Sequence, residues 1–182
     1  LSSALSCEIC GETFKELSVR SFSFNHPDGA CPHCGGIGRV MRTSPELAVP
    51  DDSKSVRAGA VKAWRYGAKS MIIKRKSILR QLSEQIPFDI NTPWRDLPQK
   101  VRDTILYGDP ERVFMLRLKR GNSRPEPVVF GGVLADVDRI CKSTPSDALR
   151  ARLSIFQTSV TCHECGGARL SERSRNVFVG GV

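Results

Sequence analysis

The chain has 182 residues, of which 40% are hydrophobic, and this length and composition suffice for a buried core. Its formal net charge is +9. The sequence has no run of about 18 apolar residues and does not start with the basic-then-apolar pattern of a signal peptide, so we expect a soluble, cytoplasmic protein with no membrane partner.

Six of the seven cysteines stand in Cys-x-x-Cys pairs, each followed by glycine. Two thiolates at this spacing can hold one side of a tetrahedral metal ion, and the glycine lets the chain turn back without a Cβ clash. Disulfides are not expected between such close cysteines in a reducing compartment, and no thioredoxin-like context supports redox chemistry. The pairs therefore predict knuckles that bind structural Zn²⁺. We number them along the chain as the first, second and third knuckle: Cys7/Cys10, Cys31/Cys34 and Cys162/Cys165.

The pairing of the knuckles is open at this point. A closed structural zinc site takes four ligands, so knuckles are used two at a time. The first and second knuckles have the spacing of a local four-cysteine finger. Alternatively, the second knuckle joins the third, which has the same Cys-x-x-Cys-Gly-Gly ending, and so holds together the ends of the segment between them. The first knuckle would then need ligands from a longer parent chain.

The segment between the second and third knuckles predicts a helical subdomain with a short hairpin. Apolar residues recur at helical spacing over residues 68–85, and Pro87 ends this helix. A second helix is predicted with an apolar stripe from Leu97 to Leu106, ended at Gly108. The first helix is strongly basic, and we expect these side chains to face solvent and DNA: Lys69, Lys74, Arg75, Lys76 and Arg80.

Residues 112–120 partly alternate apolar and basic side chains, as a strand with one wet face does, and residues 127–134 can return beside it. A third helix at about residues 147–157 leads to the third knuckle. The fold class is therefore α+β, with a small zinc-knuckle base and an inserted subdomain of helices and a short hairpin. The hairpin carries further expected phosphate contacts: Arg117, Lys119, Arg120 and Arg124.

Positive charge is concentrated in the middle of the chain. Residues 54–124 hold 17 Lys and Arg against 6 Asp and Glu, and the flanks are close to neutral. Such a cluster displaces counterions from phosphates, which favours contact with a polyanion such as duplex DNA. Alternatively, these charged residues form a solvent-exposed surface that binds no ligand, as many runs of charged residues do.

The sequence gives no sign of catalysis. It lacks a phosphate-binding loop of the form Gly-x-x-x-x-Gly-Lys-Ser/Thr, and no arrangement for nucleophilic catalysis stands out. We interpret Cys141, the cysteine outside the knuckles, as a small core residue. We therefore expect no catalytic residue in this chain.

Several motifs together resemble the UvrA family of the excinuclease ABC system. Residues 22–38, FSFNHPDGACPHCGGIG, resemble a segment of that family, and Leu106-Tyr-Gly108, Phe130-Gly-Gly-Val-Leu134 and the third knuckle follow in the family's order. The sequence departs from the usual pattern over residues 57–82 and 136–156. A divergent paralogue, of class II or the drug-resistance type, therefore stays open.

The resemblance implies an internal fragment of a damage-recognition ATPase of nucleotide excision repair. Residues 1–44 would be a zinc-knuckle segment of the first ABC half, residues 45–158 a DNA-facing insertion domain, and residues 159–182 the closing knuckle. ATP, Mg²⁺, UvrB and a second UvrA copy would bind the parent outside this piece, which would contact damaged duplex DNA. The family analogy favours pairing the second knuckle with the third. A protein-interaction or structural module of a divergent paralogue is the alternative function.

Overall fold

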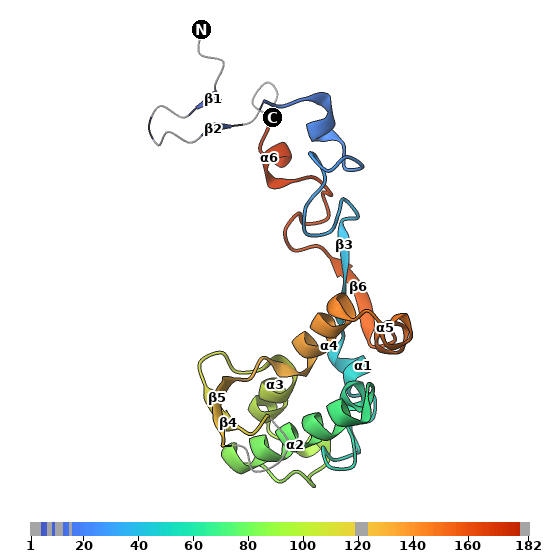
Figure 1. Ribbon diagram of the computed structural model, residues 1–182, viewed down its shortest axis with the longest axis vertical. Helices are drawn as coiled ribbons and strands as arrows, with labels where there is room; N and C mark the ends of the chain where they lie inside the picture. Colours follow the sequence, from blue (N-terminus) through green and yellow to red (C-terminus); the bar gives the residue numbers. More distant parts are fainter. Residues whose placement is uncertain (1–4, 7–8, 10–12, 15, 119–123, 179–182) are drawn as a thin grey trace. The chain divides into compact units, whose positions relative to one another are not determined.

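The computed structural model describes residues 5–6, 9, 13–14, 16–118 and 124–178 (Figure 1). The chain divides into two compact units. Unit 1 consists of Leu1–Met41 and Ser159–Val182, and unit 2 of Arg42–Thr158. The combination of helices with small antiparallel sheets confirms the predicted α+β class.

Unit 1 contains little regular structure apart from its turns. The division between the units falls within two strands, β3 and β6, which pair with each other in a two-stranded sheet. The remaining elements of unit 1 are short. The bounds are β1 (Leu5–Ser6), β2 (Thr13–Phe14), the 3₁₀ helix η1 (Val19–Phe22), β3 (Arg39–Thr43), β6 (Gln157–Thr161) and α6 (Glu172–Arg175).

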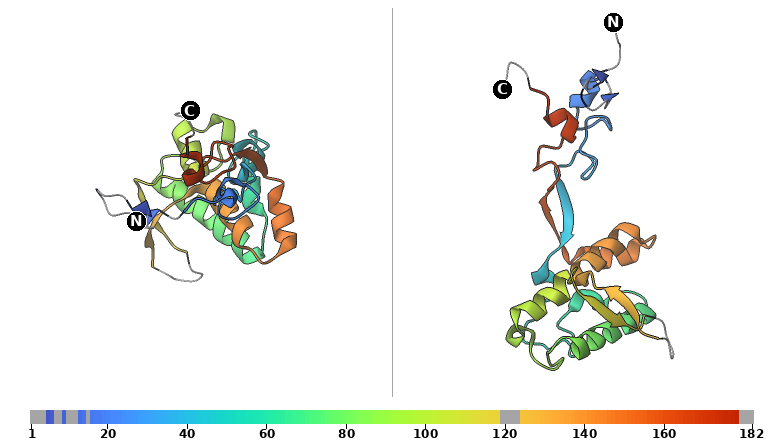
Figure 2. Two further views of the ribbon diagram at one scale, coloured as in Figure 1. Left: turned by 90° about the horizontal axis from the view of Figure 1, so that it is seen from above. Right: turned by 90° about the vertical axis from the view of Figure 1, so that its left-hand side faces the viewer.

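Unit 2 is a helical body with one hairpin. The strands β4 and β5 pair antiparallel, α2 contacts β4, and α4 packs against both α3 and α5 (Figure 2, right view). Within the described residues no helix is both long and apolar enough to span a membrane. The elements are α1 (Pro45–Ala48), η2 (Lys62–Arg65), α2 (Lys69–Gln85), η3 (Trp94–Asp96), α3 (Gln99–Tyr107), β4 (Val113–Leu116), β5 (Glu126–Val129), α4 (Gly132–Ser143) and α5 (Asp147–Ser154).

The hydrophobic core of unit 2 draws on every part of the unit. Phe114 of β4, Leu82 of α2 and Ile105 of α3 are completely buried. The ring of Phe130, just after the hairpin, receives Phe114 and Trp64 edge to face at centroid distances of 6.4 and 6.0 Å. Such contacts add to the stabilisation from buried area. Unit 2 therefore has its own core.

The two ends of unit 2 lie next to each other. The Ser44 N–H donates to the Phe156 carbonyl at 2.9 Å. The carboxylate of Asp138, on α4, accepts from the backbone N–H of Thr43 at 2.8 Å and from the Gln157 side-chain amide at 2.9 Å. One buried carboxylate thus anchors both the entering and the leaving strand.

The predicted elements agree with the structure in part. The basic helix predicted over residues 68–85 is confirmed as α2, and Gly108 caps the second helix, α3, as predicted. The return strand predicted to reach residue 134 is wrong, because β5 ends at Val129 and α4 begins at Gly132. The third helix ends at Ser154, and residues 157–161 form β6 instead.

Candidate functional site: a cysteine quartet and a basic surface

The second and third knuckles meet in unit 1. The Sγ atom of Cys31 lies 4.0 Å from that of Cys162, and the Sγ atom of Cys34 lies 3.8 Å from that of Cys165. All four side chains are buried, and their sulfurs lie within 4.8 Å of one another. We call these four residues the cysteine quartet. This arrangement is the second of the two pairings considered from the sequence.

The two halves of the cysteine quartet are built alike. The Cys31 N–H donates to the Arg169 carbonyl at 2.8 Å, and the Cys162 N–H donates to the Gly38 carbonyl at 3.0 Å. Arg169 and Gly38 hold the same position relative to their own knuckles, and both have positive φ, 70° and 81°. The hydrogen bonds are therefore reciprocal, and each knuckle orients the other.

Glycine after the second and third knuckles has a conformational reason. Gly35 and Gly166 have φ of +60° and +58°, and Gly36 has φ of +78°. A Cβ on Gly36 would also lie 2.0 Å from the Phe24 carbonyl oxygen. Glycine adopts this backbone at little cost, which explains why both knuckles end in Cys-Gly-Gly.

The surroundings of the cysteine quartet favour a thiolate at one position. Burial opposes ionisation of Cys34, but a hydrogen bond from the Gly38 N–H at 3.2 Å and contacts with the neighbouring thiols outweigh it and lower its pKa to about 7. Burial raises the pKa of Cys162 to about 11. A backbone N–H that donates to a sulfur is the support that metal-binding thiolates receive in proteins.

The cysteine quartet fits a tetrahedral metal ion. Zinc–sulfur bonds of about 2.3 Å in a tetrahedron separate the sulfurs by about 3.8 Å. The two sulfur pairs of the quartet are 4.0 and 3.8 Å apart. Four thiolates fill the coordination shell and leave no open position, which is typical of a structural site. Cys7 and Cys10 of the first knuckle lie outside the described residues.

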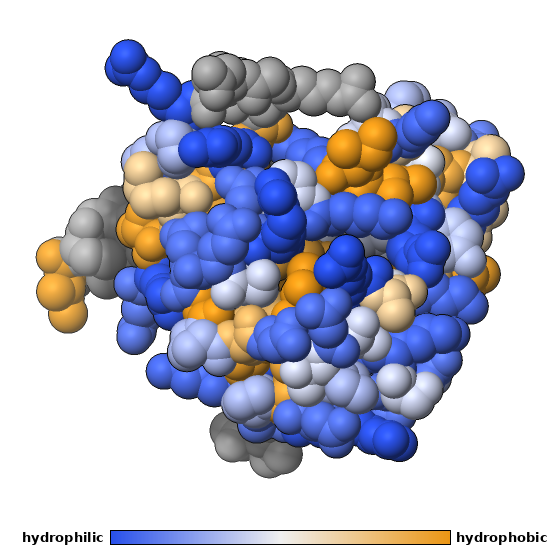
Figure 3. All heavy atoms as spheres, turned by 90° about the horizontal axis from the view of Figure 1, so that it is seen from below, coloured by the Kyte–Doolittle hydropathy of each residue, from blue (hydrophilic) through white to orange (hydrophobic). Residues whose placement is uncertain are grey.

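A second candidate site lies on α2 and the hairpin of unit 2. Its basic side chains are exposed, and none of them has an ion-pair partner in the part of the chain that the structure describes. We call them the basic surface, and the face that carries α2 is largely hydrophilic (Figure 3). Lys119 and Arg120 lie outside the described residues. The basic surface consists of Lys69, Lys74, Lys76, Arg80, Arg117 and Arg124.

Arg75 is not part of the basic surface, so the expectation that it faces solvent is wrong. Its side chain is only 4% exposed, and its guanidinium donates to Asp136 Oδ2 at 2.8 Å and to the Tyr66 carbonyl at 2.8 Å. The reason is helical phase. Arg75 precedes the buried Leu79 and Leu82 by four and seven residues, so it points to the core, where Asp136 of α4 supplies the counter-charge.

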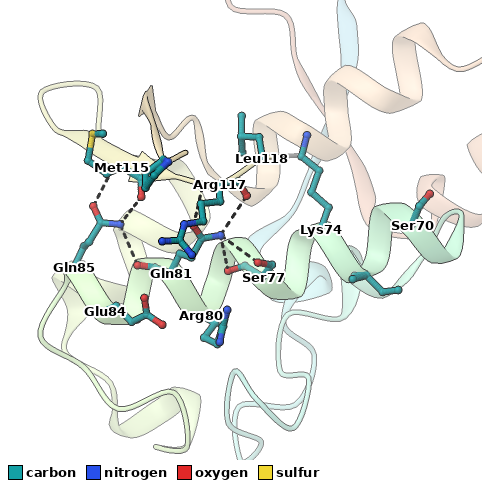
Figure 4. Close-up of a pocket in the computed structure, with 12 residues that line it drawn as sticks. Ser70, Lys74, Ser77, Arg80, Gln81, Glu84, Gln85, Met115, Arg117 and Leu118 are labelled. Carbon is teal, nitrogen blue, oxygen red and sulfur yellow. Dashed lines mark hydrogen bonds between the residues drawn. The ribbon is translucent and has the colours of Figure 1, made fainter. Parts of the chain in front are cut away.

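Two glutamines of α2 fix the hairpin beside the helix. The Gln81 Oε1 accepts from the Arg117 N–H at 2.7 Å, and the Gln85 side chain accepts from the Met115 N–H at 2.9 Å and donates to its carbonyl at 3.0 Å (Figure 4). Four helical residues rise about 6 Å, and two strand residues span about 6.6 Å, so the two repeats match. The four-residue spacing of Gln81 and Gln85 could have indicated that this face of the helix binds a strand, but we did not predict it from the sequence.

The same contacts shape a groove between α2 and β4. Its volume is about 390 Å³, and Lys74, Arg80 and Arg117 line it together with Glu84 (Figure 4). Gln81 of α2 accepts from the backbone N–H of Arg117, which directly follows β4. This hydrogen bond keeps Arg117 beside the basic helix. The groove therefore brings cations of two elements to one place.

Comparisons with known proteins bear on both sites. Residues 45–154 match the family described as UvrA DNA-binding domain. The chain is 34% identical over 183 residues to UvrABC system protein A of Staphylococcus aureus strain Mu50 and 40% identical over 183 residues to that of Micrococcus luteus. Each alignment covers 100% of this chain but only 19% and 18% of the relative, so the chain spans about a fifth of their length.

A solved structure agrees with these relatives. The crystal structure of UvrA2 from Deinococcus radiodurans matches with a TM-score of 0.68 and 28% sequence identity, covering 93% of this chain and 21% of that chain. The family match itself extends over more than half of the residues. This chain therefore belongs to the UvrA family.

Proposed function

We propose that this chain is a DNA-contacting segment of a UvrA-type protein, in which it supplies phosphate contacts and a structural zinc site and no catalytic group. The observation that carries the proposal is the basic surface, which lies within the residues matched by the UvrA DNA-binding family. Cations without internal counter-charges keep their full attraction for phosphates. Elsewhere in unit 2, by contrast, Arg75, Arg139 and Arg150 are paired with carboxylates.

We place this segment within a longer parent protein. The length of the relatives supports this, as the chain aligns with about a fifth of each. In this proposal residues 45–158 form the DNA-facing insertion domain on a zinc-knuckle base of residues 1–44 and 159–182. The parent is an ABC-type ATPase of nucleotide excision repair that binds damaged duplex DNA, a second UvrA copy and UvrB, and its ATP and Mg²⁺ sites lie outside this segment.

Charge reversal on the basic surface tests the DNA contacts. The triple variant Lys74→Glu, Arg80→Glu, Arg117→Glu is compared with a control that reverses three exposed cations on other helices, Lys100→Glu, Lys142→Glu, Arg152→Glu. Fluorescence anisotropy with labelled duplex DNA at several salt concentrations gives affinity and salt slope. We expect the first variant to lose affinity and up to about 2.7 units of log–log slope, about 0.9 for each lost phosphate contact.

The control variant separates local contact from overall charge. Equal loss of slope in both triple variants would show that net charge alone attracts DNA and would overturn the proposed surface. Failure of the parent chain to bind duplex DNA at low salt would contradict DNA contact altogether. Binding of an acidic protein with no binding of DNA would favour the interaction-module alternative.

Metal analysis tests the zinc site. We expect one Zn²⁺ per chain by elemental mass spectrometry, and intense sulfur-to-cobalt charge-transfer bands after Co²⁺ exchange. Cys162→Ser should lose the metal, whereas Cys141→Ser, at a buried cysteine outside the quartet, should keep it. A Cys7→Ser, Cys10→Ser variant should also keep it. Loss of the metal from this last variant would refute the cysteine quartet in favour of the local finger.

A further inference from the structure

A second cavity of unit 2, about 310 Å³ in volume, lies on the other side of α2 from the hairpin groove. This size is in the range of small-molecule pockets. Its walls are apolar and include Val61, Leu79, Ile90 and the indole of Trp64. We call this cavity the Trp64 pocket. An apolar interior of this kind favours a planar or hydrocarbon group over a bare ion.

The rim of the Trp64 pocket is cationic. Arg57, Arg65, Lys76 and Arg80 line it, and no carboxylate residue does. The Arg57 side chain donates to the Asn91 side-chain oxygen at 3.5 Å and the Arg65 side chain to the Ala58 carbonyl at 3.2 Å, and both acceptors are neutral. Lys76 and Arg80 have no ion-pair partner among the described residues. An anionic group would therefore be attracted to the mouth of an apolar pocket.

Arg75, the buried cation that lines the pocket, differs from the rim cations because it is paired with a carboxylate. Arg75 is neutralised by Asp136 at 2.8 Å, and its guanidinium lies 5.6 Å from the centroid of the Trp64 ring. Arg75 therefore orders the indole as part of the wall. The Trp64 side chain is 4% exposed, and its Nε1 has no hydrogen-bond partner in the described part of the chain. This indole is fixed by packing against Arg75 and Phe130, so it forms a rigid part of the pocket lining.

An apolar interior with a cationic rim matches the chemistry of a nucleotide, whose base is flat and whose phosphate is anionic. We propose that the Trp64 pocket receives one nucleotide of a DNA strand that has left its base stack. The base lies against the apolar wall, and its phosphates contact Arg57 and Arg65. Lys76 and Arg80 belong to the basic surface as well as to the rim, so a strand held by that surface passes the pocket mouth. The inference thus rests on the proposed DNA contact.

Binding to matched DNA duplexes tests the proposal. One duplex is fully paired, and the other has a single unpaired 2-aminopurine in the middle of one strand. We expect the chain to bind the second at least about tenfold more tightly, the effect of stacking one base on a protein wall. Both tryptophans lie in unit 2, so Trp94→Phe leaves Trp64 as the only reporter, and its fluorescence should fall on binding. 2-Aminopurine monophosphate serves as the free-nucleotide probe and should bind far more weakly.

Two kinds of variant locate the effect. Ile90→Trp fills the pocket without changing charge, and Arg57→Ala with Arg65→Ala removes two rim cations. Either should reduce the preference for the unpaired nucleotide to less than about twofold, since the stacking contribution is lost. Duplex affinity should persist in Ile90→Trp. The control Arg95→Ala with Arg152→Ala removes two exposed arginines outside the pocket and should keep the preference.

The outcomes separate this inference from the proposed function. Equal affinity for the two duplexes, or a preference that survives both pocket variants, would overturn the Trp64 pocket while leaving duplex contact intact. If free 2-aminopurine monophosphate binds as tightly as the duplex with the unpaired nucleotide, the pocket is a site for free nucleotides, and the proposal of a nucleotide within a DNA strand is overturned. Absence of binding to any DNA would overturn both proposals.

Discussion

At the scale of single residues, a cation of the basic helix is used internally. Arg75 pairs with Asp136 across unit 2, from α2 to α4, and Arg139 pairs with the same carboxylate from the exposed side. Removing one partner of a buried pair leaves the other without compensation, which costs more than the pair itself contributes. The ion pair therefore fixes α2 against α4, whereas the neighbouring lysines remain free for a ligand.

Replacing Arg75 should destabilise unit 2. We expect Arg75→Ala to lower the free energy of unfolding by about 3 kcal/mol, because Asp136 then keeps only its exposed partner. Lys76→Ala, one residue further along the helix and exposed, should change it by less than about 0.5 kcal/mol. Urea denaturation followed by tryptophan fluorescence measures both. Similar losses in the two variants would contradict the internal role of Arg75.

At the scale of elements, α2 covers the edge of β4 with side-chain hydrogen bonds. A further strand would cover the same edge with backbone hydrogen bonds. The N–H groups of Met115 in β4 and of Arg117 just after it point to α2, where Gln85 and Gln81 accept from them. A strand edge covered in this way cannot pair with another chain. The same contact sets the width of the groove that the basic surface lines.

Removing one glutamine should loosen the hairpin. Gln81→Ala leaves the Arg117 N–H without its acceptor, and we expect a loss of about 1–3 kcal/mol in unfolding free energy. Hydrogen exchange at the Arg117 amide should accelerate accordingly. Gln99→Ala on α3, where the glutamine contacts only side chains of its own helix, serves as the matched change and should have little effect. An unchanged exchange rate at residue 117 would refute the contact.

The elements also show how far the sequence could lead. Helix α2 was predictable because its apolar residues recur at helical spacing up to Pro87. Helix α4 was missed although Val133, Val137 and Ile140 recur at helical spacing, because β-branched residues also suit a continuation of the strand that ends at Val129. The helix packs against α3, a contact that a local pattern does not contain. The inward direction of Arg75 could be read from its helical phase with Leu79 and Leu82, but its counter-charge could not, because Asp136 belongs to a distant helix.

The cysteine quartet shows a different limit. The spacing within each knuckle is local and predicted which residues could be ligands. The choice of partner knuckle was open, because each sulfur contact joins residues 131 positions apart. Contacts at that separation depend on the fold of everything between them. Reciprocal hydrogen bonds between the knuckles were likewise beyond reach, because they arise only when the two turns meet.

At the scale of the whole molecule, the two units differ in what holds them together. Unit 2 has a core that extends from Ala48 to Phe156. In the described part of unit 1, the one buried hydrophobic cluster consists of the four quartet cysteines, with Val40 packed against them. A metal bound there would supply folding free energy directly, as in small zinc domains. The units should therefore respond differently to metal removal.

Chelation should affect unit 1 alone. We expect a strong chelator to expose the quartet thiols to a thiol reagent in the Cys7→Ser, Cys10→Ser variant. The melting temperature reported by the fluorescence of Trp64 and Trp94 should change by less than about 2 °C, because both lie in unit 2, whose core is built from hydrophobic side chains outside the quartet. A chelator-free sample provides the reference. A large fall in the melting temperature of unit 2 would show that its stability depends on the metal.

The adjacent ends of unit 2 have a consequence for how such a protein can change. Because Asp138 holds Thr43 and Gln157 together, the chain leaves the knuckles and returns to them at one point. Loops between these residues should therefore tolerate insertions without altering the path of the ligands, provided that Asp138 and α4 stay in place. A short turn joining Thr43 to Gln157 would remove Asp138, so such a miniature protein would depend on the pairing of β3 with β6 to bring the four cysteines together. Sequence changes in such loops would then leave the arrangement of the four cysteines as it is.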